Sequence, residues 1–224
     1  MPPGRPLAEW TLALAASSLA RSTESSAAGQ PCRKAARNAR AWPLVVFHHA
    51  IMRPEWSRLE RRGQAPQAWR DSARRFAGNV VGPRFEQICR DWVQDYAPEE
   101  IAGGVPSQAG HGVVNDPERK TAHEIDIVVS GNDATGQRVL LAIGEAKWAE
   151  PMGAGHLARL RRVRELLVRN GHPGAETARL LCFSGSEPSG QLRRAAAAGE
   201  VSLAGLDDLY GPGPDHGASQ PGRG

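Results

Sequence analysis

Residues 123–148 read HEIDIVVSGNDATGQRVLLAIGEAKW and contain the two most strand-like runs of the chain. The apolar segments 124–130 and 138–146 flank the polar sequence GNDATG, so this stretch predicts a β-hairpin. Each apolar run nevertheless contains charged residues, namely Asp126, Glu145 and Lys147. Charged side chains are rarely buried unless they are paired, so these three positions indicate either mutual pairing or a functional site.

The alternation of side chains along a strand predicts where these charges meet. Glu145 and Lys147 point to one face, and Asp126 shares a face with Val128 and, by strict alternation, with Glu124 at the exposed start of its strand. Pairing through the 131–136 turn then brings the carboxylates together at one end of the sheet. Adjacent carboxylates raise each other's pKa, and a hard divalent cation relieves the conflict because it prefers oxygen ligands.

Two interpretations of this cluster are open. In the first, Asp126 and Glu145 bind Mg²⁺ or Mn²⁺, and Lys147 holds an attacking water or a phosphate oxygen, which is the chemistry that phosphodiester hydrolysis requires. In the second, the three charges form a structural salt-bridge cluster that caps the strand ends.

The surrounding sequence predicts an α/β fold with a mixed sheet flanked by helices over residues 79–210. The expected elements are an amphipathic helix at 82–97, a short strand at 111–114, the hairpin strands, a helix at 155–171, a buried strand at 178–185, and a short strand and final turn at 201–211. Residues 41–78 predict a helical extension in which one helix ends near Pro54. Residues 1–40, rich in Ala, Ser and Arg, and the tail 211–224 are expected to be poorly structured.

Positive charge is concentrated in one part of the chain. The formal net charge is +4, but residues 33–75 contain eleven basic residues against three acidic ones. The predicted helix at 155–171 also has a basic polar side, which is either an ordinary solvated face or a phosphate-contacting stripe. The candidates for nucleic-acid contacts on it are Arg159, Arg162 and Arg169.

Other features exclude several classes of protein. The three cysteines have no CxxC spacing, which favours reduced thiols in a cytoplasmic protein. No run approaches the ~20 apolar residues of a membrane span, and Glu9 interrupts the first apolar segment, so neither a membrane protein nor an exported one is expected. Gly131 and Gly136 have phosphate-loop spacing, but Gln137 and Arg138 replace the required Lys and Ser/Thr, so no nucleotide site is expected.

The combination of EIDIVV at 124–129 with GEAKW at 144–148 resembles the D…ExK core of the PD-(D/E)XK nuclease superfamily. Over residues 43–210, the segments PLVVFHHAIMRPEW, GPRFEQICRDW, EIDIVV and GEAKW resemble the C-terminal domain of a family of prokaryotic AAA-type ATPases. The resemblance implies a restriction-endonuclease-like fold with Asp126 and Glu145 as metal ligands and Lys147 as the catalytic lysine. It also implies Glu86 as an accessory ligand to metal or water; otherwise Glu86 is a solvated residue that pairs with Arg90.

Two functions are therefore expected. The first is a metal-dependent, nuclease-like domain that binds nucleic acid, with DNA preferred, and hydrolyses phosphodiester bonds. The second is a catalytically inactive regulatory or interaction module, the remnant of an AAA-type ATPase protein, with an ATPase or a second copy of the chain as its partner. Relatives of full length carry an ATPase module without a counterpart here, so the chain is expected to be a detached or truncated C-terminal region that hydrolyses no ATP by itself.

Overall fold

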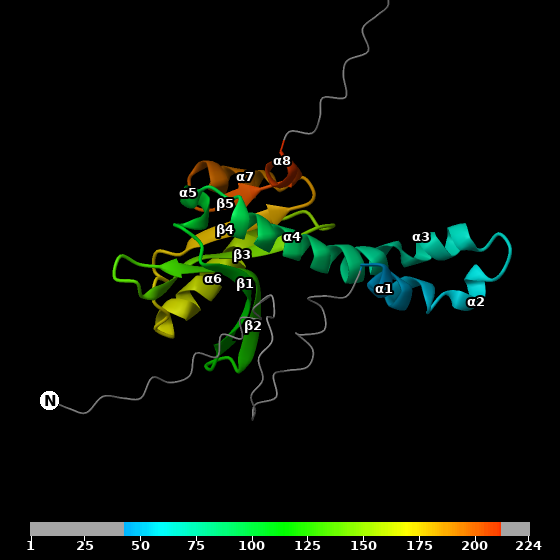
Figure 1. Cartoon of the computed structure of the whole chain (residues 1–224), viewed down its shortest axis with the longest axis horizontal. Helices are drawn as coiled ribbons and strands as arrows, with labels where there is room; N and C mark the ends of the chain where they lie inside the picture. Colours follow the sequence, from blue (N-terminus) through cyan, green and yellow to red (C-terminus); the bar gives the residue numbers. More distant parts are fainter. Residues whose placement is uncertain (1–42, 212–224) are drawn as a thin grey trace, which may run out of the picture.

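The structure is a computed structural model that describes residues 43–211 of the chain. Its centre is a five-stranded mixed sheet with helices on both faces (Figure 1). The expected α/β fold is therefore confirmed, and the arrangement is consistent with a restriction-endonuclease-like core. The expectations for residues 1–40 and 212–224 lie outside the described residues.

The sheet has the spatial order β1-β2-β3-β4-β5, the same as the order in sequence. The strands are β1 (Gln108–Asp116), β2 (Thr121–Asn132), β3 (Arg138–Lys147), β4 (Arg179–Ser184) and β5 (Ser202–Ala204). The first three pair antiparallel, whereas β3, β4 and β5 run parallel. Parallel neighbours need a crossover connection, and the helices α6 (Ala154–Arg169) and α7 (Gly190–Ala197) provide the two that are required.

Most of these elements were expected, but several differ from the prediction. Strand β1 is longer than the predicted 111–114, because its pairing with β2 extends from Gln108 to Asp116, and the short helix at 99–102 was not predicted. Helix α7 was not predicted: it is short and Ala-rich, and it buries only Leu192. The hydroxyl of Ser189 accepts a hydrogen bond from the Leu192 N–H and caps this helix, so the serine is the one sequence signal that indicates its start.

The sheet separates two hydrophobic cores. On one face, which we call the α6-side core, residues of α6 and Leu192 of α7 pack against Val128, Ile143 and Leu180. On the other face, the α4-side core joins α4 (Gly82–Asp95) and α5 (Glu99–Ala102) to Ile127, Val129 and Leu181, with α8 (Leu206–Tyr210) at its edge. The expected helix at 82–97 is thus confirmed as α4, the element that covers one face of the sheet.

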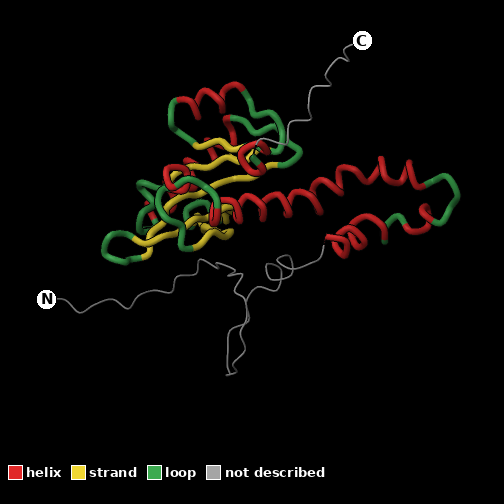
Figure 2. The backbone as a smooth tube through the Cα atoms, turned by 45° about the horizontal axis from the view of Figure 1, so that its top comes forward, coloured by secondary structure: helices red, strands yellow, loops and turns green. Residues whose placement is uncertain are grey.

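The sequence predicts helix α4 as a separate element, but the structure differs. Helix α4 continues without a break from α3 (Ala65–Phe76) through the π-helical turn η2 (Ala77–Val81). Pro83 lies in the first turn of α4 and has no N–H to donate to a preceding carbonyl. A π-helical turn before the proline accommodates this change in hydrogen bonding, and such turns often interrupt long helices. The result is a single long helical rod that ends at the sheet (Figure 2).

Residues 43–81 form a helical arm that extends away from the sheet (Figures 1 and 2). Helices α1 (Pro43–Phe47), η1 (His48–Met52) and α2 (Trp56–Leu59) fold back along α3 and η2. Helix α1 continues directly into η1, and the combined helical segment ends at Met52, just before Pro54, as expected. An aromatic cluster joins the two sides of the arm, with Phe47 5.8 Å from Phe76 and 6.3 Å from Trp69 between ring centroids.

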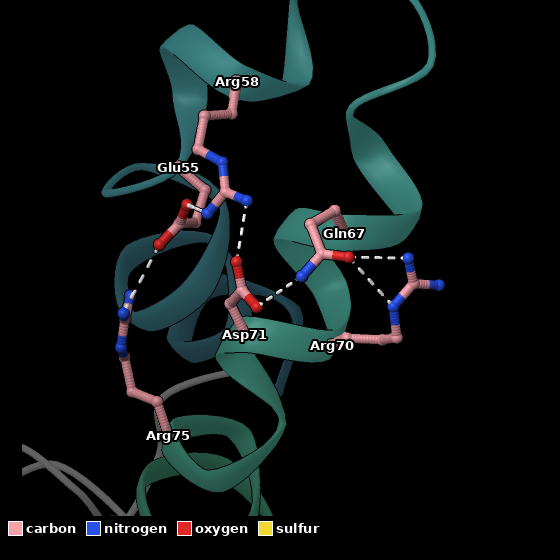
Figure 3. A network of polar contacts seen from close by, with 6 residues as sticks. All are labelled: Glu55, Arg58, Gln67, Arg70, Asp71 and Arg75. Atoms are coloured by element: carbon pink, nitrogen blue, oxygen red, sulfur yellow. Dashed lines mark hydrogen bonds and ion pairs between the residues drawn. The ribbon is translucent and has the colours of Figure 1, made fainter.

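A polar network also holds the arm together (Figure 3). Arg58 of α2 donates to Glu55 at 2.9 Å and to Asp71 of α3 at 2.8 Å, and Arg75 contacts Glu55 at 3.4 Å. The hydrogen bond from Arg58 lowers the pKa of Asp71, although this carboxyl is exposed. Among residues 43–211, no helix combines the length and apolar character that a bilayer-spanning segment requires.

Candidate functional site

The predicted carboxylates meet where the β2–β3 hairpin ladder ends. The last paired residues are Ile127 and Gly144, and Asp126 and Glu145 follow them on the two strands. Beyond this point the N–H of Ala146 donates to Oδ2 of Asp126 at 3.1 Å. The Asp126 carboxylate therefore accepts the next hydrogen bond from β3, in place of a backbone carbonyl of β2. This bond holds the carboxylate beside β3.

Lys147 connects the two carboxylates. Its Nζ lies 3.3 Å from Oε1 of Glu145 and 3.8 Å from Oδ2 of Asp126. The side chain of Glu145 is 4% exposed and that of Lys147 is 32% exposed, so the group opens to solvent on the lysine side. The structure thus brings together the three residues that the sequence singled out, and we call them the carboxylate–lysine cluster.

Arg159 of α6 belongs to this site as well. Its Nη1 donates to Oε2 of Glu145 at 2.9 Å, and its Nη2 donates to the backbone carbonyl of Glu124. Each oxygen of Glu145 therefore has its own cationic partner, Lys147 on one side and Arg159 on the other. This double pairing explains how a carboxylate can be buried almost completely in the sheet.

The three arginines predicted to contact nucleic acid do not act as one set. Arg159 is occupied by Glu145, and Arg169 forms an exposed ion pair with Glu118 at 3.7 Å. Arg162 is exposed and has no carboxylate partner within residues 43–211. Of these three, only Arg162 therefore has no carboxylate partner in the described part of the chain, and the contact of all three with nucleic acid stays a prediction.

Helix α4 supplies the other wall of the site through Glu86 and Arg90. Nη1 of Arg90 donates to the backbone carbonyl of Asp126 at 2.7 Å and lies 3.8 Å from the Glu86 carboxylate. Burial raises the pKa of Glu86, and the negative charge of Asp126 raises it further. Glu86 consequently fits both sequence interpretations, because it pairs with Arg90 and also faces the cluster.

Asp126 and Glu145 supply carboxylate oxygens, the type of donor that a hard divalent cation prefers. The pKa of Asp126 is raised chiefly by burial and further by the negative charge of Glu145, while the Ala146 N–H and Lys147 lower it. Partly buried carboxylate oxygens in such a field are the ligands that Mg²⁺ and Mn²⁺ favour. Within the described part of the chain, no three His, Cys, Asp or Glu side chains are grouped closely enough to hold a metal. Glu86 therefore lies near Asp126 and Glu145 but does not form a three-ligand group with them.

A β-bulge at the site was not predicted from the sequence. Gly110 of β1 pairs with Val128 and Gly112 pairs with Ile125, so β2 has one extra residue opposite His111. Ile125 and Val128 accordingly pack in the same core, although strict alternation places residues three apart on opposite faces. The alternation that placed Glu124 and Asp126 on one face therefore fails in this stretch, although Glu124 is exposed as expected.

The bulge has only an indirect signal in the sequence, and the role of Arg90 has none. Glycines inside a strand often mark a bulge, but Gly110 and Gly112 lie on β1, opposite the extra residue of β2. Bulges commonly lie beside functional sites, where they re-aim a side chain. The helical spacing indicates Arg90 only as the partner of Glu86, and its contact with Asp126 joins residues 36 positions apart, which no local pattern indicates.

Comparisons with known proteins add little to this geometry. No protein-family model matches the chain, and no curated protein matches it. Among solved structures, it is similar to the crystal structure of protein VC1899 from Vibrio cholerae, at 15% sequence identity and a TM-score of 0.37. The match covers 75% of this chain and 48% of the other, so this chain spans about half the length of that protein. The functional conclusions therefore depend on the site alone.

Proposed function

We propose that this protein is a metal-dependent, nuclease-like domain that binds nucleic acid, preferentially DNA, and hydrolyses phosphodiester bonds. The observation that carries the proposal is the carboxylate–lysine cluster, in which Asp126 and Glu145 approach a single amine, Lys147 Nζ, at 3.8 and 3.3 Å. The spacing of these residues in EIDIVV and GEAKW, which resembles the PD-(D/E)XK core, supports the same function.

Each residue of the site has a distinct role in this proposal. Asp126 and Glu145 would hold Mg²⁺ or Mn²⁺, which when bound supplies Lewis-acid stabilisation of charge on the phosphate. Lys147 is solvent-accessible and orients the attacking water, and its ammonium stabilises the negative charge of the pentacoordinate phosphorus. Arg90 and Arg159 hold the two carboxylate-bearing strands in place, and Glu86 provides an additional acceptor for water.

The test is metal-dependent cleavage of DNA and RNA by the wild-type chain, Asp126→Asn and Lys147→Ala. Both variants are expected to lower the cleavage rate by at least about 100-fold, since each removes a group that contacts the reacting phosphate or its cation. Lys120→Ala, an exposed lysine in the β1–β2 turn, is the matched control and should cleave like the wild type. Binding of Mn²⁺, measured by calorimetry, gives a readout that is independent of turnover, and Asp126→Asn should abolish it.

A second function is favoured by one specific observation. Both oxygens of Glu145 are already neutralised by Lys147 and Arg159, which is also what a structural ion-pair cluster achieves. In that case the chain is an inactive regulatory or interaction module, a remnant of an AAA-type ATPase protein, whose partner is an ATPase or a second copy. Absence of both cleavage and Mn²⁺ binding in the wild type would exclude the nuclease proposal and leave this alternative.

The cytoplasm is the proposed compartment. Cys89 and Cys182 are free thiols, and both are fully buried. They belong to different cores on opposite faces of the sheet, so they cannot pair with each other. Free, separated thiols suit a reducing environment.

A further inference from the structure

The arm and the first turn of α4 have an unusual charge balance. Residues 43–84 contain eight arginines, no lysine and three acidic residues, which gives a net charge of +5, whereas the whole chain has +4. Residues 85–224 contain 14 basic and 19 acidic residues, a net charge of −5, and residues 1–42 carry +4. The arm is therefore positive whereas the α/β body beside it is negative, and such a local excess of positive charge attracts a polyanion.

The ion pairs divide these arginines into two groups. Arg58 and Arg75 are partly buried and bind the carboxylates of Glu55 and Asp71 (Figure 3). Glu60, the third acid, accepts a hydrogen bond from Trp56. Arg70 donates to the Gln67 side chain, and its charge adds to the Arg58 hydrogen bond in lowering the pKa of Asp71 (Figure 3). The other arginines are exposed and have no carboxylate partner among residues 43–211, and we call them the free arginines: Arg53, Arg61, Arg62, Arg74 and Arg84.

The free arginines lead along the arm to the candidate site. Arg61 and Arg62 lie in the turn between α2 and α3 at the tip of the arm, Arg74 lies on α3, and Arg84 is two residues from Glu86 (Figure 1). Because α3, η2 and α4 form one continuous rod, Arg74 stands about 18 Å from Glu86 at the helical rise per residue. A duplex advances ~3.4 Å per base pair, so this distance corresponds to about five base pairs.

We propose that the arm binds the phosphate backbone of a nucleic acid whose scissile bond lies at the carboxylate–lysine cluster. This inference rests on the proposed function for the chemistry of the partner. Exposed guanidinium groups without carboxylate partners are the residues that contact phosphates independently of sequence. The arm therefore contributes affinity and orientation along the strand, whereas the site at the end of α4 contributes chemistry.

The experiment compares two triple variants of the full chain that lower the net charge equally. The arm variant is Arg61→Gln/Arg62→Gln/Arg74→Gln, and the control is Arg119→Gln/Arg179→Gln/Arg194→Gln, which changes exposed arginines of the α/β body. Binding to fluorescein-labelled 30-base-pair duplexes of DNA and of RNA is measured by anisotropy in EDTA, over a series of salt concentrations. Circular dichroism confirms that each variant retains the wild-type helix content.

The arm variant is expected to bind at least about 10-fold more weakly, and its slope of log affinity against log salt should fall by about 0.9 for each phosphate that the arm no longer neutralises. The control should keep the wild-type slope. Equal slopes for the arm variant and the control would overturn the proposal, as would tighter wild-type binding to polyglutamate than to either duplex, which would indicate an acidic protein partner. The DNA and RNA series distinguish the two sources of phosphate.

Cleavage assays keep this inference separate from the proposed function. If wild type binds a duplex through the arm but cleaves nothing with Mn²⁺, phosphate binding by the arm is supported, whereas the nuclease proposal and the placement of a scissile bond at the cluster both fail. If wild type cleaves and the arm variant cleaves with the same KM, the nuclease proposal stands and the arm proposal fails. Both are supported when the arm variant raises KM and leaves kcat within about 3-fold of the wild type.

Discussion

At the scale of single residues, Glu145 depends on contacts from two directions. Its side chain is 4% exposed, and its oxygens are bound by Lys147 from its own strand and by Arg159 from α6. An ionised carboxylate with so little access to water is tolerated only when its oxygens are paired. Loss of one cation therefore leaves one oxygen of this buried carboxylate without its cationic partner.

We predict that Arg159→Met lowers the free energy of unfolding by about 1–3 kcal/mol. This is less than the full effect of breaking a buried pair, because Arg159 is 37% exposed and Lys147 still contacts Glu145. Urea denaturation measures the change. Arg162→Met, three residues further along α6 at an exposed position, should change stability by less than about 0.5 kcal/mol. Equal effects of the two substitutions would contradict the role given to Arg159.

The sequence was sufficient to identify Asp126, Glu145 and Lys147, because charges inside apolar strands stand out against a simple pattern. It was not sufficient for the contact between Arg159 and Glu145, because the basic side of the helix indicates Arg159 only as a candidate contact for nucleic acid. A helical pattern shows that Arg159 lies on the polar side of α6, but whether that position borders solvent or the end of β3 depends on how the helix packs. Long side chains reach partners that local periodicity does not define.

At the scale of elements, the β2–β3 hairpin is held at its turn as well as at its site. Oδ1 of Asp133 accepts hydrogen bonds from the N–H groups of Thr135 and Gln137 and from the Thr135 hydroxyl, at 2.7–2.9 Å. These bonds lower the pKa of Asp133, with the hydroxyl as the largest cause. The segment GNDATG thus forms a turn organised by an aspartate, in agreement with its assignment as a hairpin connection.

We predict that Thr135→Ala raises the pKa of Asp133 toward its ordinary value, as measured by NMR titration. A carboxyl pKa that is lower in the folded state adds stability above the unfolded pKa, and this stability is lost as pH falls through the folded pKa. The stability difference between wild type and Thr135→Ala should therefore shrink on acidification. Thr177→Ala removes a hydroxyl that donates to the Gly174 carbonyl, which does not titrate, so its effect should be independent of pH.

Gly144 shows why GEAKW begins with a residue that has no side chain. A Cβ at this position would lie 3.0 Å from Cβ of Leu181, 3.1 Å from the Leu181 carbonyl oxygen and 3.3 Å from Cβ of Ile127. These atoms belong to the strands on either side of β3 and cannot move as the end of a flexible side chain can. The close approach of three central strands thus requires glycine next to Glu145.

We predict that Gly144→Ala lowers stability by about 1–3 kcal/mol through overpacking, measured by urea denaturation. Gly155→Ala in α6 is the matched control: its Cβ would meet nothing within 4 Å, so the substitution should be neutral or stabilise the helix by up to about 1 kcal/mol. An unchanged stability of Gly144→Ala would show that the strands separate more easily than their packing implies. Glycine content alone did not reveal this contact, because it depends on which strands flank β3.

At the scale of the whole molecule, the protein combines a two-core α/β body with an arm that belongs to neither core. The described core residues of both faces come from residue 85 onward. In the arm, α3 buries only Ala68 and Ser72, whereas α6 buries Leu157, Leu160, Val163, Leu166 and Leu167. Each large apolar side chain contributes roughly 1.5–3 kcal/mol on burial, so the two helices differ greatly in the packing that holds them.

This difference predicts unequal local stability, which hydrogen exchange measured by mass spectrometry on the full chain can test. Amides of α3 should exchange with an opening free energy at least about 2 kcal/mol below those of α6, a helix of comparable length, because few buried contacts oppose local opening of the arm. Addition of duplex DNA should slow exchange in α3 and leave α6 nearly unchanged, since phosphate contacts along the free arginines would order the arm. If α3 exchanges as slowly as α6 in the absence of nucleic acid, this prediction is contradicted. The arm would then be stabilised by another contact, such as binding to a second copy of the chain.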